Sequence, residues 1–228
     1  MKTKITSLLF AIVGALFFIS CNDTEEIVPE VPEVHKDRAV LIALLKANSE
    51  ATLSWDTTEV ELSSWPGVIT DDAGNVIVLN LESSAIIALP AAIGDLDHLT
   101  QLRLNNNAIT ELPSEIGKLT RLEVLELAGN ELTSVPTELG SLNHLVYLGL
   151  HHNHLSTIPA TVNQLQSLRW LYLHNNQLTA LPKELGELTK LESLALHHNN
   201  LTVIPQEVCN LATTLTLSFY LDEGVDCE

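Results

Sequence analysis

The sequence predicts an α/β solenoid with a curved parallel β-sheet on the concave face, short helical or irregular turns on the convex face, and a helical N-terminal cap. Two observations carry this prediction. Six prolines recur at a 23-residue step, and each lies in the frame LxxLxLxxNxLxxLPxxLGxL: Pro90, Pro113, Pro136, Pro159, Pro182 and Pro205. A period of about 20 to 50 residues is typical of stacked arrays, in which each unit buries its apolar side against its neighbours.

The repeats extend over residues 76–213. They form six units with the same step: 76–98, 99–121, 122–144, 145–167, 168–190 and 191–213. Their frame resembles that of the leucine-rich repeat family, and the LPxxLGxL half is similar to the 23-residue variety of Ras-group and many bacterial leucine-rich repeat proteins. Residues 214–228 are expected to form a partial seventh unit that closes the C-terminal end.

The N-terminal residues 1–20 are typical of a secretory signal. Lys2 and Lys4 precede an apolar run that is shorter than the about 20 residues needed to span a bilayer. The run ends in Phe18-Ile19-Ser20-Cys21, which is similar to the lipobox of bacterial lipoproteins, although that motif usually has leucine where Phe18 stands. The resemblance implies that Cys21 carries acyl chains such as palmitate and anchors the protein in the bacterial cell envelope. The alternative is ordinary cleavage that leaves Cys21 free.

Residues 21–36 are acidic and contain two prolines, a composition that predicts a disordered tether. The acidic cluster Asp23, Glu25 and Glu26 is similar to signals that send some Gram-negative lipoproteins to the outer face of the outer membrane. A tether that is acidic only for solvation is the alternative, so either face of the outer membrane fits the sequence.

Residues 37–75 depart from the repeat and are expected to form the N-terminal cap. Helical apolar spacing occurs within 38–47: Val40, Leu41, Leu44 and Leu45. The run from Ser63 resembles the cap of secreted leucine-rich repeat proteins, in which disulfide-bonded cysteines flank a tryptophan such as Trp65. Ser63 and Thr70 stand at those cysteine positions, so the cap is expected to close the first repeat by packing alone.

Within each repeat, the frame assigns structural roles. Alternation such as Leu102-Arg103-Leu104 predicts a short strand whose leucines point inward. Five asparagines that follow the strands are expected to satisfy buried backbone groups of adjacent repeats: Asn107, Asn130, Asn153, Asn176 and Asn199. Ser84 and Asp222 stand in place of asparagine at the two ends. Prolines suit the outer return half of each repeat. Glycines follow a one-turn helix, where a positive φ is expected: Gly94, Gly117, Gly140 and Gly186.

The third, fifth and seventh residues of each repeat are expected to line the concave face, because the leucines between them point inward. In the first three repeats these positions hold small, polar or charged residues: Val78, Asn80, Glu82, Gln101, Arg103, Asn105, Val124, Glu126 and Ala128. In the last three they hold aromatic residues and histidines among small ones: Tyr147, Gly149, His151, Trp170, Tyr172, His174, Ser193, Ala195 and His197. Tyr220 is expected to extend the seventh-residue column. Gly149 is expected to leave a small depression beside Trp170 that admits a ligand side chain.

The predicted partner-binding residues are the large side chains of these columns: Tyr147, His151, Trp170, Tyr172, His174 and His197. The scaffold does not require them, and Tyr and Trp dominate binding hot spots. An aromatic ladder that only stiffens the sheet is one alternative. A glycan or small-ligand capture lipoprotein of a nutrient-uptake system, with a sugar ring on Trp170, is another. A zinc or copper site is a third alternative, because the three histidines are expected about 4.8 Å apart on adjacent strands. The histidines could also form only a solvated surface.

Two cysteines remain if Cys21 is acylated. Cys209 and Cys227 are then the one possible intramolecular pair, and an exported, oxidising setting favours a disulfide between them.

Composition limits the partner. Asp and Glu number 29 against 11 Lys and Arg, which gives a formal net charge of −18 and excludes a basic nucleic-acid footprint. Catalytic and nucleotide-binding motifs such as GxSxG, the P-loop and HExxH do not occur in the sequence, and no cofactor is expected. The sequence therefore predicts a non-enzymatic envelope lipoprotein that binds a protein or peptide and touches the membrane only through its lipid anchor.

Overall fold

A computed structural model describes residues 33–59, 61–214 and 218–227. The predicted signal, Cys21 and the tether up to residue 32 lie outside these residues. Within the described part, no helix combines the length and the apolar character that a membrane crossing requires.

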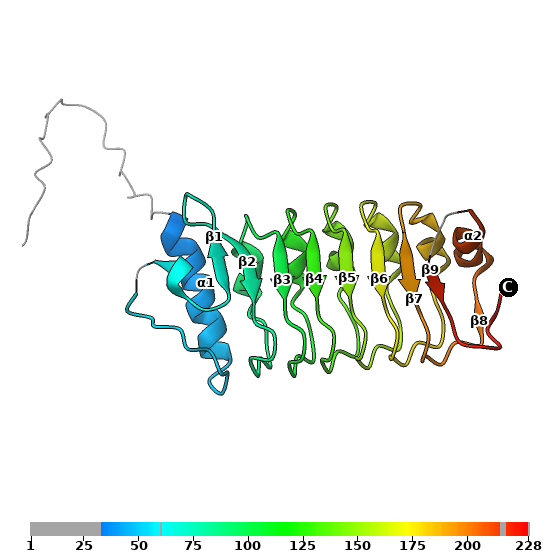
Figure 1. The fold of residues 1–228 in the computed structure, drawn as a ribbon, viewed down its shortest axis with the longest axis horizontal. Helices are drawn as coiled ribbons and strands as arrows, with labels where there is room; N and C mark the ends of the chain where they lie inside the picture. Colours follow the sequence, from blue (N-terminus) through cyan, green and yellow to red (C-terminus); the bar gives the residue numbers. More distant parts are fainter. Residues whose placement is uncertain (1–32, 60, 215–217, 228) are drawn as a thin grey trace, which may run out of the picture. The chain divides into compact units, whose positions relative to one another are not determined.

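One eight-stranded sheet extends through the repeats (Figure 1), in the order β1-β2-β3-β4-β5-β6-β7-β9. Its strands are β1 Val68–Thr70, β2 Val76–Asn80, β3 Gln101–Arg103, β4 Val124–Glu126, β5 Tyr147–Gly149, β6 Trp170–Tyr172, β7 Ser193–Ala195 and β9 Ser218–Tyr220. Strand β1 is antiparallel to β2, and every later pair in the sheet is parallel. From β2 to β7, pairing follows the 23-residue step, as in Leu102 opposite Leu125. Equivalent positions therefore form columns, and the predicted solenoid is confirmed.

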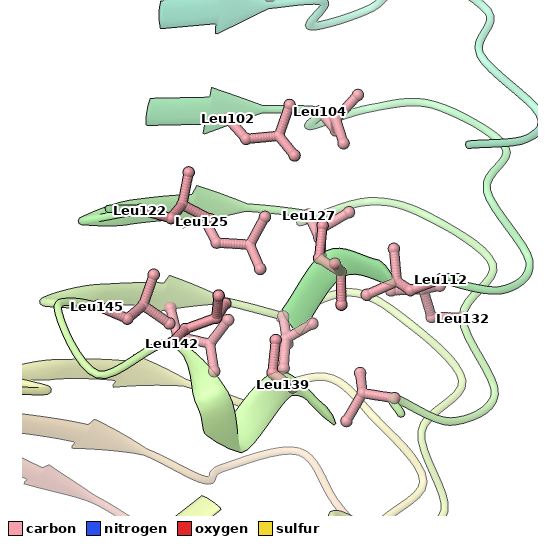
Figure 2. Close-up of a cluster of buried hydrophobic side chains, with 14 of the residues drawn as sticks. Leu102, Leu104, Leu112, Leu122, Leu125, Leu127, Leu132, Leu139, Leu142 and Leu145 are labelled. Carbon is pink, nitrogen blue, oxygen red and sulfur yellow. The ribbon is translucent and has the colours of Figure 1, made fainter. Parts of the chain in front are cut away.

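The leucines of the frame fill the interior behind the sheet. Figure 2 shows Leu125 and Leu127 lying below Leu102 and Leu104 of the preceding repeat, so that each repeat covers the apolar side of the one before. All four side chains are fully buried. Burial of one such leucine stabilises a fold by about 1.5–3 kcal/mol, which a single repeat cannot accumulate without its neighbours.

The asparagines form the predicted ladder along the turns that follow the strands. Asn153 is representative: its Nδ2 donates to the carbonyl oxygens of Leu127 (2.9 Å) and Leu150 (3.0 Å), and its Oδ1 accepts from the backbone N–H of Leu132 (3.0 Å). One amide thus serves two repeats. At the C-terminal end, Asp222 accepts from the N–H of Asn199 at 3.3 Å, so a carboxylate continues the ladder as expected.

The return half of each repeat is a short 3₁₀ helix that begins directly after a proline. These helices are η2 Ala91–Asp95, η3 Ser114–Lys118, η4 Thr137–Ser141, η5 Ala160–Gln164 and η6 Lys183–Glu187. Pro205 instead precedes an α-helix, α2 Gln206–Thr214. Proline at these positions supplies a fixed φ and needs no partner for an N–H.

The positive φ expected at Gly94, Gly117, Gly140 and Gly186 is wrong. The glycines with positive φ in the described part of the chain are Gly67, Gly74, Gly129 and Gly224. The helical glycines have a different role, because a Cβ on Gly117 would lie 2.5 Å from the carbonyl oxygen of Glu138 in the next repeat. Close approach of neighbouring backbones, rather than backbone conformation, therefore favours glycine there.

The segment before the first repeat contains α1 Glu33–Ala47 and the 3₁₀ helix η1 Leu62–Ser64. The helix α1 includes the expected 38–47 segment and begins five residues earlier. Buried Asp37 accepts from the N–H of Val76 at 2.8 Å, and buried Asn48 accepts from the N–H of Ile87 at 2.7 Å. Polar side chains of this segment thus pair with backbone groups of the first repeat.

Cysteines link the last elements of the chain. Strand β8 Val203–Ile204 pairs in parallel with β10 Asp226–Cys227, beside α2. The structure joins Cys209 of α2 to Cys227 by a disulfide, with the two Cα atoms 6.2 Å apart.

The expected position of Tyr220 is wrong. Tyr220 pairs with Ala195 and Phe219 with Leu194, so the last strand follows at a 25-residue step. Tyr220 therefore continues the fifth-residue column, in which Tyr172 and Ala195 precede it, and not the seventh-residue column.

Candidate functional site

The six predicted partner-binding residues lie together on the face of the sheet that points away from the leucine interior. Tyr147, Trp170 and Tyr172 belong to β5 and β6, and all three are partly exposed. The rings of Tyr147 and Tyr172 meet edge to face, with centroids 5.4 Å apart. We call the surface formed by Tyr147, His151, Trp170, Tyr172, His174 and His197 the aromatic face.

The seventh-residue histidines His151, His174 and His197 form a stack, which we call the histidine ladder. Ring centroids are 4.5 Å apart between His151 and His174 and 4.6 Å apart between His174 and His197, with interplanar angles of 13° and 9°. The straight columns of the sheet produce this stacking, because equivalent residues of adjacent strands are separated by about 4.8 Å.

Two rings of the ladder, His151 and His174, are held in the neutral form. The Nδ1 atom of each ring is buried without a hydrogen-bond partner, so a proton there would have no acceptor. Burial, with the neighbouring histidines adding to it, lowers the pKa of His174 to about 4, and burial also lowers the pKa of His151. At neutral pH His151 and His174 therefore add no positive charge to the aromatic face.

The same geometry gives the metal alternative no support. Parallel stacked rings hold their nitrogens side by side and do not point them toward one position, as ligands about 2.0–2.1 Å from a zinc ion must. Nowhere in residues 33–59, 61–214 and 218–227 do three or more His, Cys, Asp or Glu side chains gather in a way that can hold a metal ion.

Trp170 has an intramolecular partner that the sequence analysis missed. The guanidinium of Arg169 stands 4.9 Å from the centroid of the Trp170 ring, and Arg169 also donates to Glu192 at 2.7 Å. Arg169 and Glu192 are 23 residues apart, so the repeat step already indicates that they are neighbours. Because the guanidinium covers one side of the indole, a sugar ring cannot stack there unless Arg169 moves.

Charged residues border the aromatic face on its N-terminal side. Arg103 pairs with Glu126 at 3.2 Å, and Glu126 also accepts from Asn105 at 2.6 Å. Burial, with Glu126 nearby, raises the pKa of Tyr147 to about 12, so its hydroxyl remains a hydrogen-bond donor at neutral pH.

The depression expected at Gly149 is absent. Gly149 is buried, and a Cβ placed on it would lie 3.1 Å from Cε1 of Tyr147. The ring of Tyr147 therefore fills the space that the missing side chain leaves. A depression lies one repeat earlier, around Ala128 and Gly129.

A family model described as leucine rich repeat matches residues 97–155, 155–201 and 166–218 of the chain. No curated protein matches the sequence.

Solved structures with the same architecture come from bacteria and plants. A leucine-rich repeat protein of Leptospira interrogans is 38% identical with a TM-score of 0.55, over 60% of this chain and 34% of that one. The plant peptide hormone receptor RGFR1, solved with RGF2, is 28% identical with a TM-score of 0.54, over 60% of this chain and 22% of that one. The Arabidopsis receptor kinase HAESA, solved with the peptide hormone IDA and the co-receptor SERK1, is 26% identical with a TM-score of 0.59, over 85% of this chain and 41% of that one. The chain thus spans about a third of the Leptospira protein and about a fifth of RGFR1.

Proposed function

The chain belongs to the leucine-rich repeat family, and on that premise we propose that it binds a protein or peptide partner through the aromatic face of its fourth to sixth repeats. Leucine-rich repeat domains typically mediate protein–protein interactions and are generally non-enzymatic. The observation that carries the proposal is the concentration of partly exposed aromatic and histidine side chains in columns where the fold needs none.

Physical chemistry supports this use of the face. Tyr and Trp bury a large area and keep a polar group for hydrogen bonding, so they dominate the energetics of protein interfaces. The rings of Tyr147 and Tyr172 are already packed against each other. Such a preformed surface loses little conformational entropy when a partner binds.

Related structures support the class of partner. RGFR1 was solved with RGF2, and HAESA with a peptide hormone and a co-receptor, so this architecture accepts peptides and proteins in other chains. A glycan partner has less support, because Arg169 occupies one side of the Trp170 ring.

We further propose that the protein is an envelope lipoprotein anchored through Cys21, on the outer membrane. The lipobox-like Phe18-Ile19-Ser20-Cys21 supports the anchor. A disulfide between Cys209 and Cys227 fits an exported protein, since disulfides persist in oxidising compartments.

Replacement of Trp170 by alanine is expected to weaken partner binding at least about tenfold, because tryptophan side chains are among those that dominate the energetics of protein interfaces. The measurement is crosslinking capture from intact cell envelopes with the wild-type chain, followed by titration of the captured partner against Trp170→Ala.

The matched control is Ile87→Ala, which removes an apolar side chain that is 55% exposed outside the aromatic face. Ile87→Ala should bind like the wild type. Equal affinity of wild type and Trp170→Ala for the captured partner contradicts the proposed site.

A further inference from the structure

The third repeat interrupts two columns of side chains at the border of the aromatic face. In the seventh-residue column, Ala128 stands between Asn105 and His151. In the column of eighth residues, Gly129 has a positive φ and no side chain. The equivalent residues of the other repeats also have a positive φ but carry side chains: Ser83, Asn106, His152, Asn175 and His198. The two small residues leave a depression of about 430 Å³. Amides and Glu82 form one wall, and His151 and His152 form the other.

The amide wall has free acceptor oxygens. Asn105 donates to Glu126 (2.6 Å) and accepts from the N–H of Ala128 (2.9 Å), so both ends of its amide are engaged. Asn106 Nδ2 donates to Glu82 Oε1 at 3.3 Å. Among the described residues, no hydrogen bond reaches Glu82 Oε2 or Asn106 Oδ1. The wall therefore offers a carboxylate oxygen and an amide oxygen to an incoming donor.

On the imidazole wall, His151 does not repel a cation. His151 is the first ring of the histidine ladder, and its buried Nδ1 keeps it neutral. His152 Nε2 lies 3.4 Å from Asn175 Nδ2. The guanidinium of Arg103 is already paired with Glu126.

We propose that this depression receives a lysine or arginine side chain of the protein or peptide partner. An ammonium or guanidinium group has only donors, which complements the free carboxylate oxygen of Glu82, the amide oxygen of Asn106 and the negative charge of the wall. The formal net charge of −18 attracts such a partner at longer range. This assignment rests on the proposed function, and it names the chemistry of the residue that the partner inserts beside the aromatic face.

A small probe tests the pocket without the partner. The full chain is titrated at neutral pH with Nα-acetyl-lysine methylamide, and the backbone amide signals of Asn106, Gly129 and His152 are followed by NMR. Norleucine in place of lysine is the control, because it keeps the stem and lacks the ammonium. Saturable shifts with lysine alone are expected, whereas equal shifts with norleucine overturn the assignment.

Two variants separate charge from shape. Glu82→Gln removes the charge and is expected to weaken lysine binding at least about threefold, as loss of a charge-assisted hydrogen bond does. Glu138→Gln removes the same charge from exposed η4 outside the depression and should leave the affinity unchanged. If Glu82→Gln binds lysine like the wild type, the carboxylate is not the recognition group and the assignment fails.

Gly129→Asn fills the depression. Asparagine occupies the same position in two other repeats, at φ 56° for Asn106 and 54° for Asn175, so the backbone accepts it. A Cβ at position 129 would approach Asn106 Oδ1 to 2.7 Å, at the end of a side chain that can rotate away. Gly129→Asn is expected to abolish the lysine-dependent shifts, and retained shifts contradict the pocket.

Partner capture distinguishes this assignment from the proposed function. Loss of capture by both Trp170→Ala and Gly129→Asn supports both. Loss by Trp170→Ala with unchanged affinity in Gly129→Asn and Glu82→Gln contradicts the pocket and leaves the proposed function standing. Lysine binding without a captured partner contradicts the proposed function alone.

Discussion

Replacement of Asn153 by alanine is expected to lower the free energy of unfolding by about 2–4 kcal/mol. The Asn153 amide supplies donors to the carbonyl oxygens of Leu127 and Leu150 and an acceptor to the N–H of Leu132. Alanine leaves the N–H of Leu132 without a partner at a buried position, which costs about 1–3 kcal/mol. The two carbonyl oxygens each lose one donor, worth about 0.5–1.5 kcal/mol net, and keep another from Asn130 and Asn176. Because the amide joins two repeats, the loss falls on the interface between neighbours.

Urea denaturation of the two proteins measures this difference. Asn143→Ala is the control, because Asn143 is exposed and lies outside the ladder. The control should change the free energy of unfolding by less than about 0.5 kcal/mol. A loss below about 1 kcal/mol for Asn153→Ala shows that the ladder does not stabilise the solenoid in this way.

Acid is expected to destabilise the fold through the histidine ladder before the carboxylates titrate. Burial lowers the pKa of His174 from 6.5 to about 4. The unfolded chain therefore takes up a proton at a higher pH than the folded protein does. The stability that the neutral ring contributes is fully present above about pH 6.5 and is lost as the pH falls toward 4. With allowance for the partly exposed rings, we expect a loss of about 2 kcal/mol over this window.

The measurement is the free energy of unfolding from urea titrations at pH values between 7 and 4.5. His174→Asn is expected to flatten the pH dependence, because asparagine does not titrate and already occupies this column as Asn105. His144→Asn, an exposed histidine outside the ladder, should retain the wild-type dependence. An unchanged dependence in His174→Asn contradicts the assignment to the ladder.

The repeat period predicted most of the architecture. The columns, the asparagine ladder and the helical turns after the prolines follow from a constant step, because parallel strands in constant register bring equivalent residues together. The period failed where the step changes. The chain from β7 to β9 advances by 25 residues, and this shift alone moves Tyr220 to another column.

Contacts between side chains were harder to predict. The role of Gly117 depends on how closely two backbones approach, and the filled space at Gly149 depends on the rotamer of Tyr147. The stacking of His151, His174 and His197 follows from their common column, but the parallel orientation of their rings does not. The pair Ala128-Gly129 does interrupt the columns visibly, so the sequence contains a signal for the depression.

The most direct test of the proposed function is to determine which face of the solenoid touches the partner. A photoreactive benzoylphenylalanine replaces Tyr172 on the aromatic face in one protein and Glu138 in η4 in another, and both are irradiated in intact cell envelopes. We predict a discrete crosslinked product from position 172 and none from position 138. A product from position 138 without one from position 172 would contradict binding through the aromatic face.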